Sequence, residues 1–95
     1  MHVQIYHPRL RAGPLRAEAV IILDLHGKNV YQARVALEAA LRRRGGAYRL
    51  RVIHGYGHNT SLKDMIWAEY ARHPAVLRLE AGDNPGQTDL VLREL

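Results

Sequence analysis

The stretch VIILDLHG, residues 20–27, decides how the chain folds. Its apolar and β-branched residues are typical of a strand buried in the middle of a sheet, and the closing glycine ends that strand. Side chains two apart on a strand point to the same face. Asp24 and His26 therefore project together, while the two leucines of the motif project to the other side. The buried strand delivers a carboxylate and an imidazole to one face at its carboxyl end.

The sequence around this strand predicts two helices and three further strands. Helical spacing from residue 29 to 44 begins at Asn29, a good N-cap, and ends at a Gly-Gly pair. Ser61 and Asp64 resemble a capping box at the start of the second helix. The remaining elements are a strand over 48–54, a helix over about 62–72 and strands over 76–81 and 88–95. This order predicts an α/β fold, a two-layer sandwich with a mixed sheet of four strands.

The first 17 residues are expected to form an N-terminal arm, and residues 18–95 a single domain. Pro8, Gly13 and Pro14 interrupt the arm, although VQIY within it alternates as an edge strand does. A chain of 95 residues is long enough for one modest core and too short for two.

Composition points to a globular, basic protein. The net charge is +5, and twelve of the fourteen basic residues are arginine, which suits phosphate binding. The chain has no cysteine, which excludes disulfides and thiolate metal sites. It has no apolar run long enough to span a membrane and no secretory signal at its N-terminus, so a cytoplasmic location and no membrane partner are expected.

A second His-Gly phrase, RVIHGYG at residues 51–57, ends the next strand. If the two strands are parallel, His54 gathers with Asp24 and His26 at the edge where open α/β sheets bind ligands. Gly55 and Gly57 directly precede a helix N-terminus, where flexible backbone and partial positive charge suit a phosphate. The two phrases are therefore predicted to form one site.

Five residues are predicted to bind nucleic acid at this site: Gly55, Tyr56, Gly57, His58 and Lys28. Tyr56 either stacks on an unpaired base or covers the loop, and His58 either contacts phosphate or is solvated. Arg49 and Arg51 are further candidates for a nucleic-acid face, and solvated positions suit them equally well. Trp67, in the second helix, is expected to lie in the core.

Asp24, His26 and His54 together suit general acid–base cleavage of a phosphodiester. One imidazole takes a proton from the attacking hydroxyl, a second protonates the leaving oxygen, and the carboxylate orients an imidazole. No cofactor is required on RNA, because the 2′-OH is an internal nucleophile. A divalent cation is the alternative, but this ligand set is thin for magnesium. The non-catalytic interpretation makes the carboxylate a loop cap and the imidazoles hydrogen-bonded strand ends.

The phrases LDLHG, VIHGYG and GQTDLVL together resemble the small MutS-related, or Smr, domain family over about residues 20–95. The resemblance implies a fold similar to the C-terminal domain of bacterial translation initiation factor three. It also implies nucleic-acid binding and, in many members, endonuclease activity on DNA or RNA, in proteins associated with ribosomes or mismatch repair. This chain is expected to be a free-standing bacterial type. It departs from many relatives by placing Tyr56, and not a basic residue, between the glycines.

Three functions are consistent with these residues. The first is a small endonuclease, with RNA slightly ahead of DNA as substrate. The second is a non-catalytic nucleic-acid-binding module, and the third is an adaptor on a ribosome or a repair complex. The sequence leaves the oligomeric state open.

Overall fold

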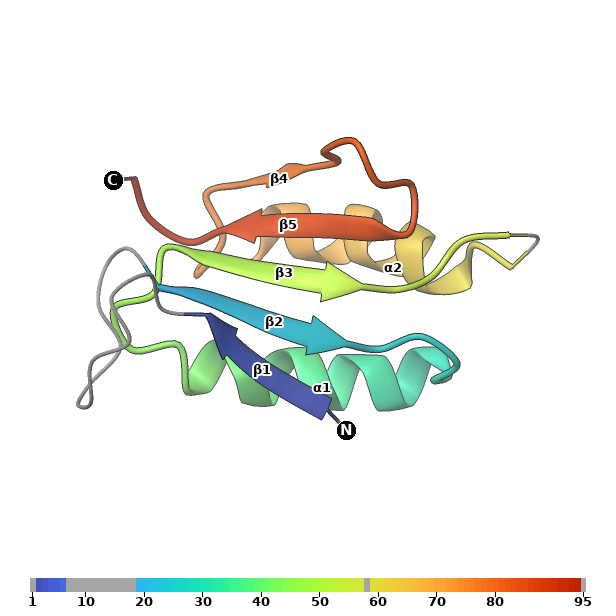
Figure 1. Cartoon of the computed structure of the whole chain (residues 1–95), viewed down its shortest axis with the longest axis horizontal. Coiled ribbons are helices and arrows are strands. Elements are labelled where there is room, and N and C mark those ends of the chain that lie inside the picture. Colours follow the sequence, from blue (N-terminus) through green and yellow to red (C-terminus); the bar gives the residue numbers. More distant parts are fainter. Residues whose placement is uncertain (1, 7–18, 58, 95) are drawn as a thin grey trace.

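The computed structural model describes residues 2–6, 19–57 and 59–94, and in this part of the chain it contains a sheet of five strands in the order β1-β2-β3-β5-β4 (Figure 1). Their bounds are β1 His2–Tyr6, β2 Val20–Asp24, β3 Arg49–Ile53, β4 Arg78–Glu80 and β5 Gln87–Val91. β2 and β3 are parallel, and the other neighbouring pairs are antiparallel. The four strands predicted for the domain are present in a mixed sheet.

β1 is the strand that the prediction of four did not count. It pairs antiparallel with β2 along its whole length and extends the sheet at that edge. The alternation of VQIY thus does mark an edge strand. Residues 7–18 lie outside the described part, so the division of the chain into an arm and a domain at residue 18 stays a prediction.

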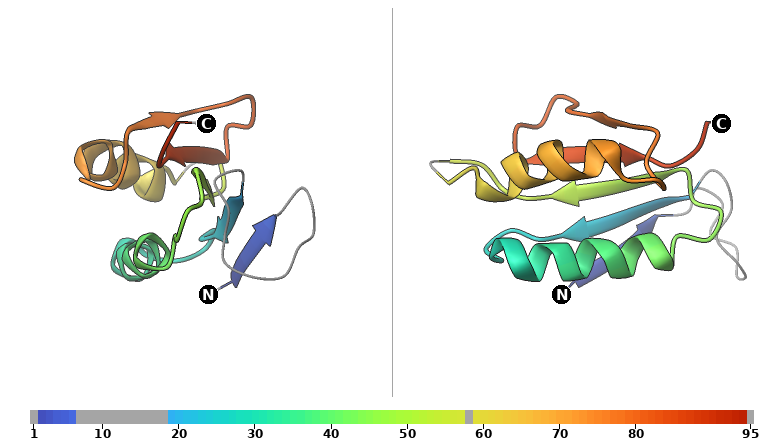
Figure 2. Two further views of the ribbon diagram at one scale, coloured as in Figure 1. Left: turned by 90° about the vertical axis from the view of Figure 1, so that its left-hand side faces the viewer. Right: turned by 180° about the vertical axis from the view of Figure 1, so that it is seen from behind.

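Two α-helices cover one face of the sheet, which confirms the two-layer architecture (Figure 2). They are α1, Val30–Arg42, and α2, Ser61–Glu69, which continues as a short 3-10 helix η1, Tyr70–Arg72. None of the helices in the described residues is long and apolar enough to cross a membrane.

The N-cap side chain of α1 bonds to the helix backbone, and that of α2 does not. At α1 the side chain of Asn29 accepts from the Gln32 backbone N–H at 2.7 Å, and the Gln32 side chain accepts from the Asn29 N–H at 3.0 Å. This capping box confirms the predicted role of Asn29. At α2 the N-cap is Thr60 and not Ser61, and the Thr60 hydroxyl donates to Asp64 at 2.9 Å. The helix therefore begins at Ser61, one residue earlier than predicted.

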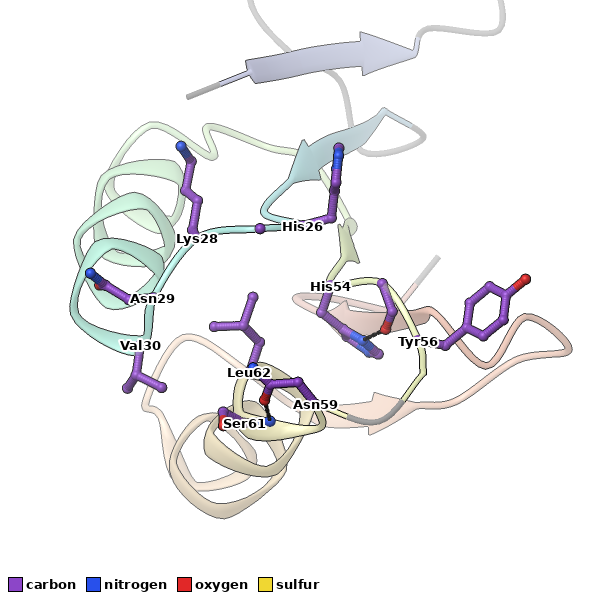
Figure 3. Close-up of a pocket in the computed structure, with 11 residues that line it drawn as sticks. His26, Lys28, Asn29, Val30, His54, Tyr56, Asn59, Ser61 and Leu62 are labelled. Carbon is purple, nitrogen blue, oxygen red and sulfur yellow. Dashed lines mark hydrogen bonds between the residues drawn. The ribbon is translucent and has the colours of Figure 1, made fainter.

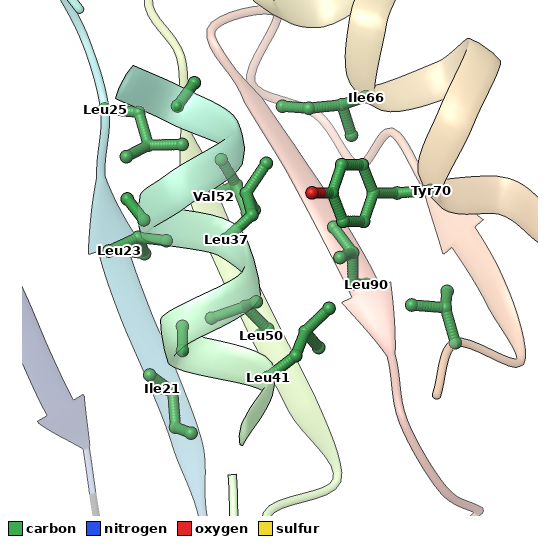
Figure 4. Packing of buried hydrophobic residues seen from close by; sticks show 14 of the residues in the cluster. Ile21, Leu23, Leu25, Leu37, Leu41, Leu50, Val52, Ile66, Tyr70 and Leu90 are labelled. Carbon is green, nitrogen blue, oxygen red and sulfur yellow. The ribbon is translucent and has the colours of Figure 1, made fainter. Parts of the chain in front are cut away.

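The core lies between the sheet and the two helices (Figure 4). Leu23 and Leu25 of β2 and its continuation are 0% exposed, whereas Asp24 between them is partly exposed. This is the alternation that the period of two predicts. The largest fully buried side chains include Leu23, Leu25, Leu37, Leu50, Ile66 and Leu90.

The face of the sheet opposite the helices carries a cluster of ion pairs. Arg49 contacts Asp89 and Glu80, each at 2.8 Å, and Arg51 contacts Asp89 at 3.1 Å. Asp89 is buried, and its burial alone would raise its pKa. The hydrogen bonds and charges of the two arginines outweigh burial and hold the pKa of Asp89 below its usual value. Both arginines that were candidates for a nucleic-acid face thus have acidic partners.

This cluster makes the fold sensitive to acid. Because its pKa is lower in the folded chain than in the unfolded one, Asp89 stabilises the fold above about pH 4 and loses that contribution as pH falls through its folded pKa. We expect Asp89→Asn to lower the free energy of unfolding at pH 7 by about 1–3 kcal/mol and to flatten its decrease between pH 5 and pH 2. Urea unfolding at several pH values measures both effects. The exposed Asp83→Asn is the matched control, and an equally steep acid dependence in Asp89→Asn would refute the assignment.

Candidate phosphate-binding and catalytic site

A pocket of about 620 Å³ opens at the carboxyl ends of β2 and β3, between the N-termini of α1 and α2 (Figure 3). The first N–H groups of a helix have no partner within the helix and carry partial positive charge. Two such helix ends and the Lys28 side chain make this pocket suitable for an anion. It is lined by His26, Gly27, Lys28, Asn29, Val30, His54, Gly55, Tyr56, Asn59, Ser61 and Leu62.

Asp24 and His26 form a hydrogen-bonded pair at the end of β2. The His26 Nδ1 lies 2.5 Å from the Asp24 Oδ1, and the same oxygen accepts from the His26 backbone N–H at 3.1 Å. An ionised carboxylate can only accept, so Nδ1 carries a proton. In the neutral ring the lone pair is then on Nε2, and the His26 side chain is 70% exposed. Asp24 therefore fixes the tautomer and orientation of an accessible imidazole.

His54 lies in a different environment, with only 7% of its surface exposed. Its Nδ1 is 2.8 Å from the carbonyl oxygen of Gly55, and its Nε2 is 2.9 Å from the hydroxyl of Thr88. A carbonyl only accepts, so Nδ1 donates, and the neutral ring accepts the Thr88 hydroxyl proton at Nε2. The Trp67 indole N–H in turn donates to the Thr88 oxygen at 3.1 Å. Both nitrogens of this imidazole are engaged inside the protein.

His26 and His54 both line the pocket, but their side chains do not face each other. Asp24 pairs with Ile53 in the parallel register, so His54, one residue later, projects to the face opposite Asp24. Figure 3 shows the His26 side chain directed away from His54, whose ring is bonded to the Gly55 carbonyl. The expectation of one shared edge agrees with the structure, but the three side chains do not converge there.

The glycine loop after His54 is held in place by the loop that precedes β5. The backbone N–H groups of His54 and Gly55 both donate to the Gly86 carbonyl, at 2.9 and 3.0 Å. Gly55 and Gly57 have φ values of +80° and +129°, which other residues rarely adopt. A Cβ on Gly86 would lie 3.1 Å from the Tyr56 ring and 3.3 Å from the Gly55 carbonyl carbon, so the two loops pack closely.

The other predicted binding residues are distributed around the pocket. Lys28 and Gly55 line it, and Tyr56 lies at its rim with 80% of its surface exposed. Gly57 is exposed and is not among the lining residues. His58 lies outside the described residues.

Several residues of the site escaped the sequence analysis. Thr88 and Trp67 support His54, and Asn59, Ser61 and Leu62 form the α2 side of the pocket. Trp67, expected in the core, is 38% exposed and contributes through its indole N–H. One signal in the sequence could have identified Thr88. It is a polar residue two positions before the buried Leu90 in an alternating strand, so it faces the core.

Comparison with known families identifies the chain. The family model of the Smr domain matches residues 23–88, which include both His-Gly phrases and Thr88. The chain belongs to the Smr domain family. This family is associated with nucleic-acid binding and with endonucleases. No curated protein sequence matches the chain.

A solved structure supports the same assignment. The Smr domain of Thermus thermophilus MutS2 is 28% identical to this chain, with a TM-score of 0.69. The match covers 77% of this chain and 98% of the MutS2 domain. The fold of this Smr domain is thus similar to a known one over almost the whole length of that structure.

Proposed function

We propose that this Smr domain binds a nucleic-acid phosphodiester in the pocket between α1 and α2 and cleaves it with the Asp24–His26 pair. The observation that carries the proposal is the hydrogen bond between these two side chains, which leaves an exposed imidazole beside an anion-binding pocket. RNA is the preferred substrate, because its 2′-OH supplies the nucleophile.

His26 acts as the general base in this proposal. Its Nε2 removes the proton of a 2′-OH, and the resulting oxygen attacks the adjacent phosphorus. A 2′,3′-cyclic phosphate forms, the bond from phosphorus to the 5′ oxygen breaks, and that oxygen leaves with a proton from solvent. Asp24 stabilises the imidazolium that forms, and Lys28 with the two helix N-termini binds the phosphate oxygens.

We assign His54 a positioning role and not an acid–base role. Its Nε2 would have to break the bond to Thr88 before it could transfer a proton to a substrate. Its Nδ1 instead holds the carbonyl of Gly55, so the ring fixes the loop that forms one wall of the pocket. His54 was predicted to be the second catalytic imidazole. In this proposal it instead positions the loop that helps to bind phosphate.

The second candidate function is binding without cleavage. The burial of His54 favours it, because only one of the two predicted catalytic imidazoles is then free to act. Within the described ranges, no group of three or more His, Cys, Asp or Glu side chains is placed to hold a metal ion. A cation could still use Asp24 with phosphate oxygens of the substrate, and a chelator tests that requirement.

A substrate panel separates the two functions. The purified domain is incubated with end-labelled single-stranded RNA, the same sequence as DNA, and a duplex, with and without EDTA. We expect cleavage of the single-stranded RNA that EDTA does not abolish. Binding that weakens steeply with salt, without cleavage of any substrate, would instead establish the binding module.

A further inference from the structure

The positive charge of the described chain is unevenly distributed. Four arginines, Arg34, Arg49, Arg51 and Arg78, form ion pairs with acidic side chains. None of the ion pairs among the described residues involves Arg42, Arg43, Arg44 or Arg93. The same holds for Arg72, Lys28 and Lys63, but the four arginines gather at one end of the molecule, and we call them the arginine cluster.

The arginine cluster lies at the end of α1 opposite to the pocket. Arg42 is the last residue of the helix, Arg43 is its C-cap, and Arg44 donates to the Leu41 carbonyl at 2.7 Å. Arg93, after β5, joins them by donating to the Gly46 carbonyl at 3.5 Å. Arg44 and Arg93 thus bond to backbone carbonyls, and one cation is sufficient to neutralise the helix C-terminus. Arg42 and Arg43 are exposed, so their charge is accessible to a ligand.

One exposed face of α1 connects the pocket with this cluster. Lys28, Tyr31, Gln32, Val35, Ala39, Arg42 and Arg43 follow the helical spacing of three and four residues along it. Tyr31 is 73% exposed and Val35 50% exposed, which is unusual for large apolar groups side by side on a helix. The acidic residue of α1, Glu38, is bound to the Tyr70 hydroxyl at 2.7 Å and to His73 at 3.3 Å.

A shallow groove lies along this face, next to the pocket. It has a volume of about 270 Å³ and is lined by Lys28, Tyr31, Gln32, Val35 and Ala36. Lys28 lines both the groove and the pocket, so the two are adjacent. The exposed face of α1 as a whole has Lys28 at one end, the Tyr31 ring along its length and the arginine cluster at the other end. This arrangement suits an unpaired nucleic-acid strand.

We infer that the exposed face of α1 is a binding track for single-stranded nucleic acid, which continues from the phosphate in the pocket to the arginine cluster. The inference rests on the proposed function for the position of the bound phosphate. Lys28, Arg42 and Arg43 contact backbone phosphates, and Tyr31 stacks on a base. Paired bases do not offer that face, so the track selects an unpaired strand. At 1.5 Å per residue α1 is about 20 Å long, which corresponds to about six stacked nucleotides at 3.4 Å each.

Substrate length tests the track. Dissociation constants are measured for uridine oligonucleotides of 4 and 12 nucleotides and for a 12-base-pair RNA duplex, at several salt concentrations. The short strand reaches only the pocket, and the long strand reaches the arginine cluster. For Arg42→Ala combined with Arg43→Ala we expect about tenfold weaker binding of the 12-mer, a salt slope lower by about 1.4, and unchanged binding of the 4-mer.

Tyr31 provides the second measurement. Tyr31→Ala is expected to weaken binding of the 12-mer by about tenfold, and Tyr31→Phe to restore it, because stacking needs the ring and not the hydroxyl. Neither change should affect the duplex. The matched charge control is Arg78→Ala, which removes one cation at β4, away from the track. Its effect on the 12-mer should be less than half that of Arg43→Ala alone.

Three results would overturn the track: equal losses for the 4-mer and the 12-mer, an equal loss in Arg78→Ala, or no length dependence in the wild type. These are distinct from a failure of the proposed cleavage. If the wild type cuts no substrate while the variants lose affinity for the long strand alone, the track holds and the catalytic proposal fails. If the 4-mer and 12-mer are cut but bind equally well, the reverse holds.

Discussion

His26→Asn is expected to lower the single-turnover rate of RNA cleavage by about 10²- to 10⁴-fold, the range for loss of a general base. The side chain of asparagine is smaller but also polar, and it cannot take up a proton at neutral pH. Because the pocket, Lys28 and both helix N-termini are unchanged, the dissociation constant for the same RNA should change by less than about threefold. The effect should therefore appear in the rate and not in binding.

Two further variants make this prediction specific. Asp24→Asn leaves a polar side chain beside Nδ1 but removes the charge that stabilises the imidazolium, so a similar loss of rate is expected. His73→Asn removes an imidazole at the far end of α2, after η1, and should retain the wild-type rate. Full activity in His26→Asn would exclude His26 as the base and direct attention to other groups of the pocket.

Thr88→Val should destabilise the fold by about 2–3 kcal/mol, although the two side chains have nearly the same shape. Thr88 is 0% exposed, and its hydroxyl is bonded to both the His54 Nε2 and the Trp67 Nε1. Valine leaves a buried acceptor and a partly buried donor without partners, and each such group costs about 1–3 kcal/mol. Trp67 contributes the smaller share, since it is partly exposed and its N–H can reach water.

Urea unfolding of the variant at neutral pH measures this loss. Thr88→Ser keeps the hydroxyl and should recover most of the stability apart from one methyl group. Thr60→Val is the control, and its cost should stay at about 1 kcal/mol or less, because this exposed hydroxyl makes no hydrogen bond to the helix backbone. If the loop is positioned through His54, Thr88→Val should also weaken binding of the 4-mer. Unchanged stability and unchanged binding would contradict the hydrogen-bond network as described.

The strand period predicted that Asp24 and His26 lie together at the end of β2, and the structure places them there. Alternation within VIILDLHG separates Asp24 and His26 from the buried leucines, and the parallel pairing of β2 and β3 follows from the helix between them. The end of β2, which lies at the carboxyl edge of the sheet, and the helical cap at Asn29 could be predicted for the same reason. Each depends on interactions within a few residues.

The environment of His54 could not be read from the motif alone. In RLRVIH the ring has the parity of Leu50 and Val52, which are buried, and so it faces the helices and not Asp24. The sequence contains that parity. The prediction of one shared site, however, rested on the common edge of the sheet and not on the face to which each side chain projects. The partner hydroxyl, Thr88, comes from a strand 34 residues later, and only the antiparallel pairing of β3 with β5 brings it close.

The start of α2 and the extent of the sheet illustrate a second limit. Asn59, Thr60 and Ser61 can all cap a helix, and the backbone of the preceding loop decides that Thr60 takes this position. β1 was not counted in the predicted sheet, although VQIY alternates as an edge strand does, because the prolines after it suggested an irregular arm. Strand pairing needs only the five residues His2–Tyr6. Tertiary contacts override such local signals.

The role of the 2′-OH provides the most direct test of the proposed mechanism. A 12-nucleotide DNA strand that contains a single ribonucleotide is incubated with the domain, in parallel with the all-DNA strand, and the products are separated at single-nucleotide resolution. Attack by a 2′-OH that His26 deprotonates predicts one cut, directly 3′ of the ribonucleotide, with a 2′,3′-cyclic phosphate end and no cut in the all-DNA strand. Equal cleavage of both strands, or binding of both without any cleavage, would contradict the mechanism.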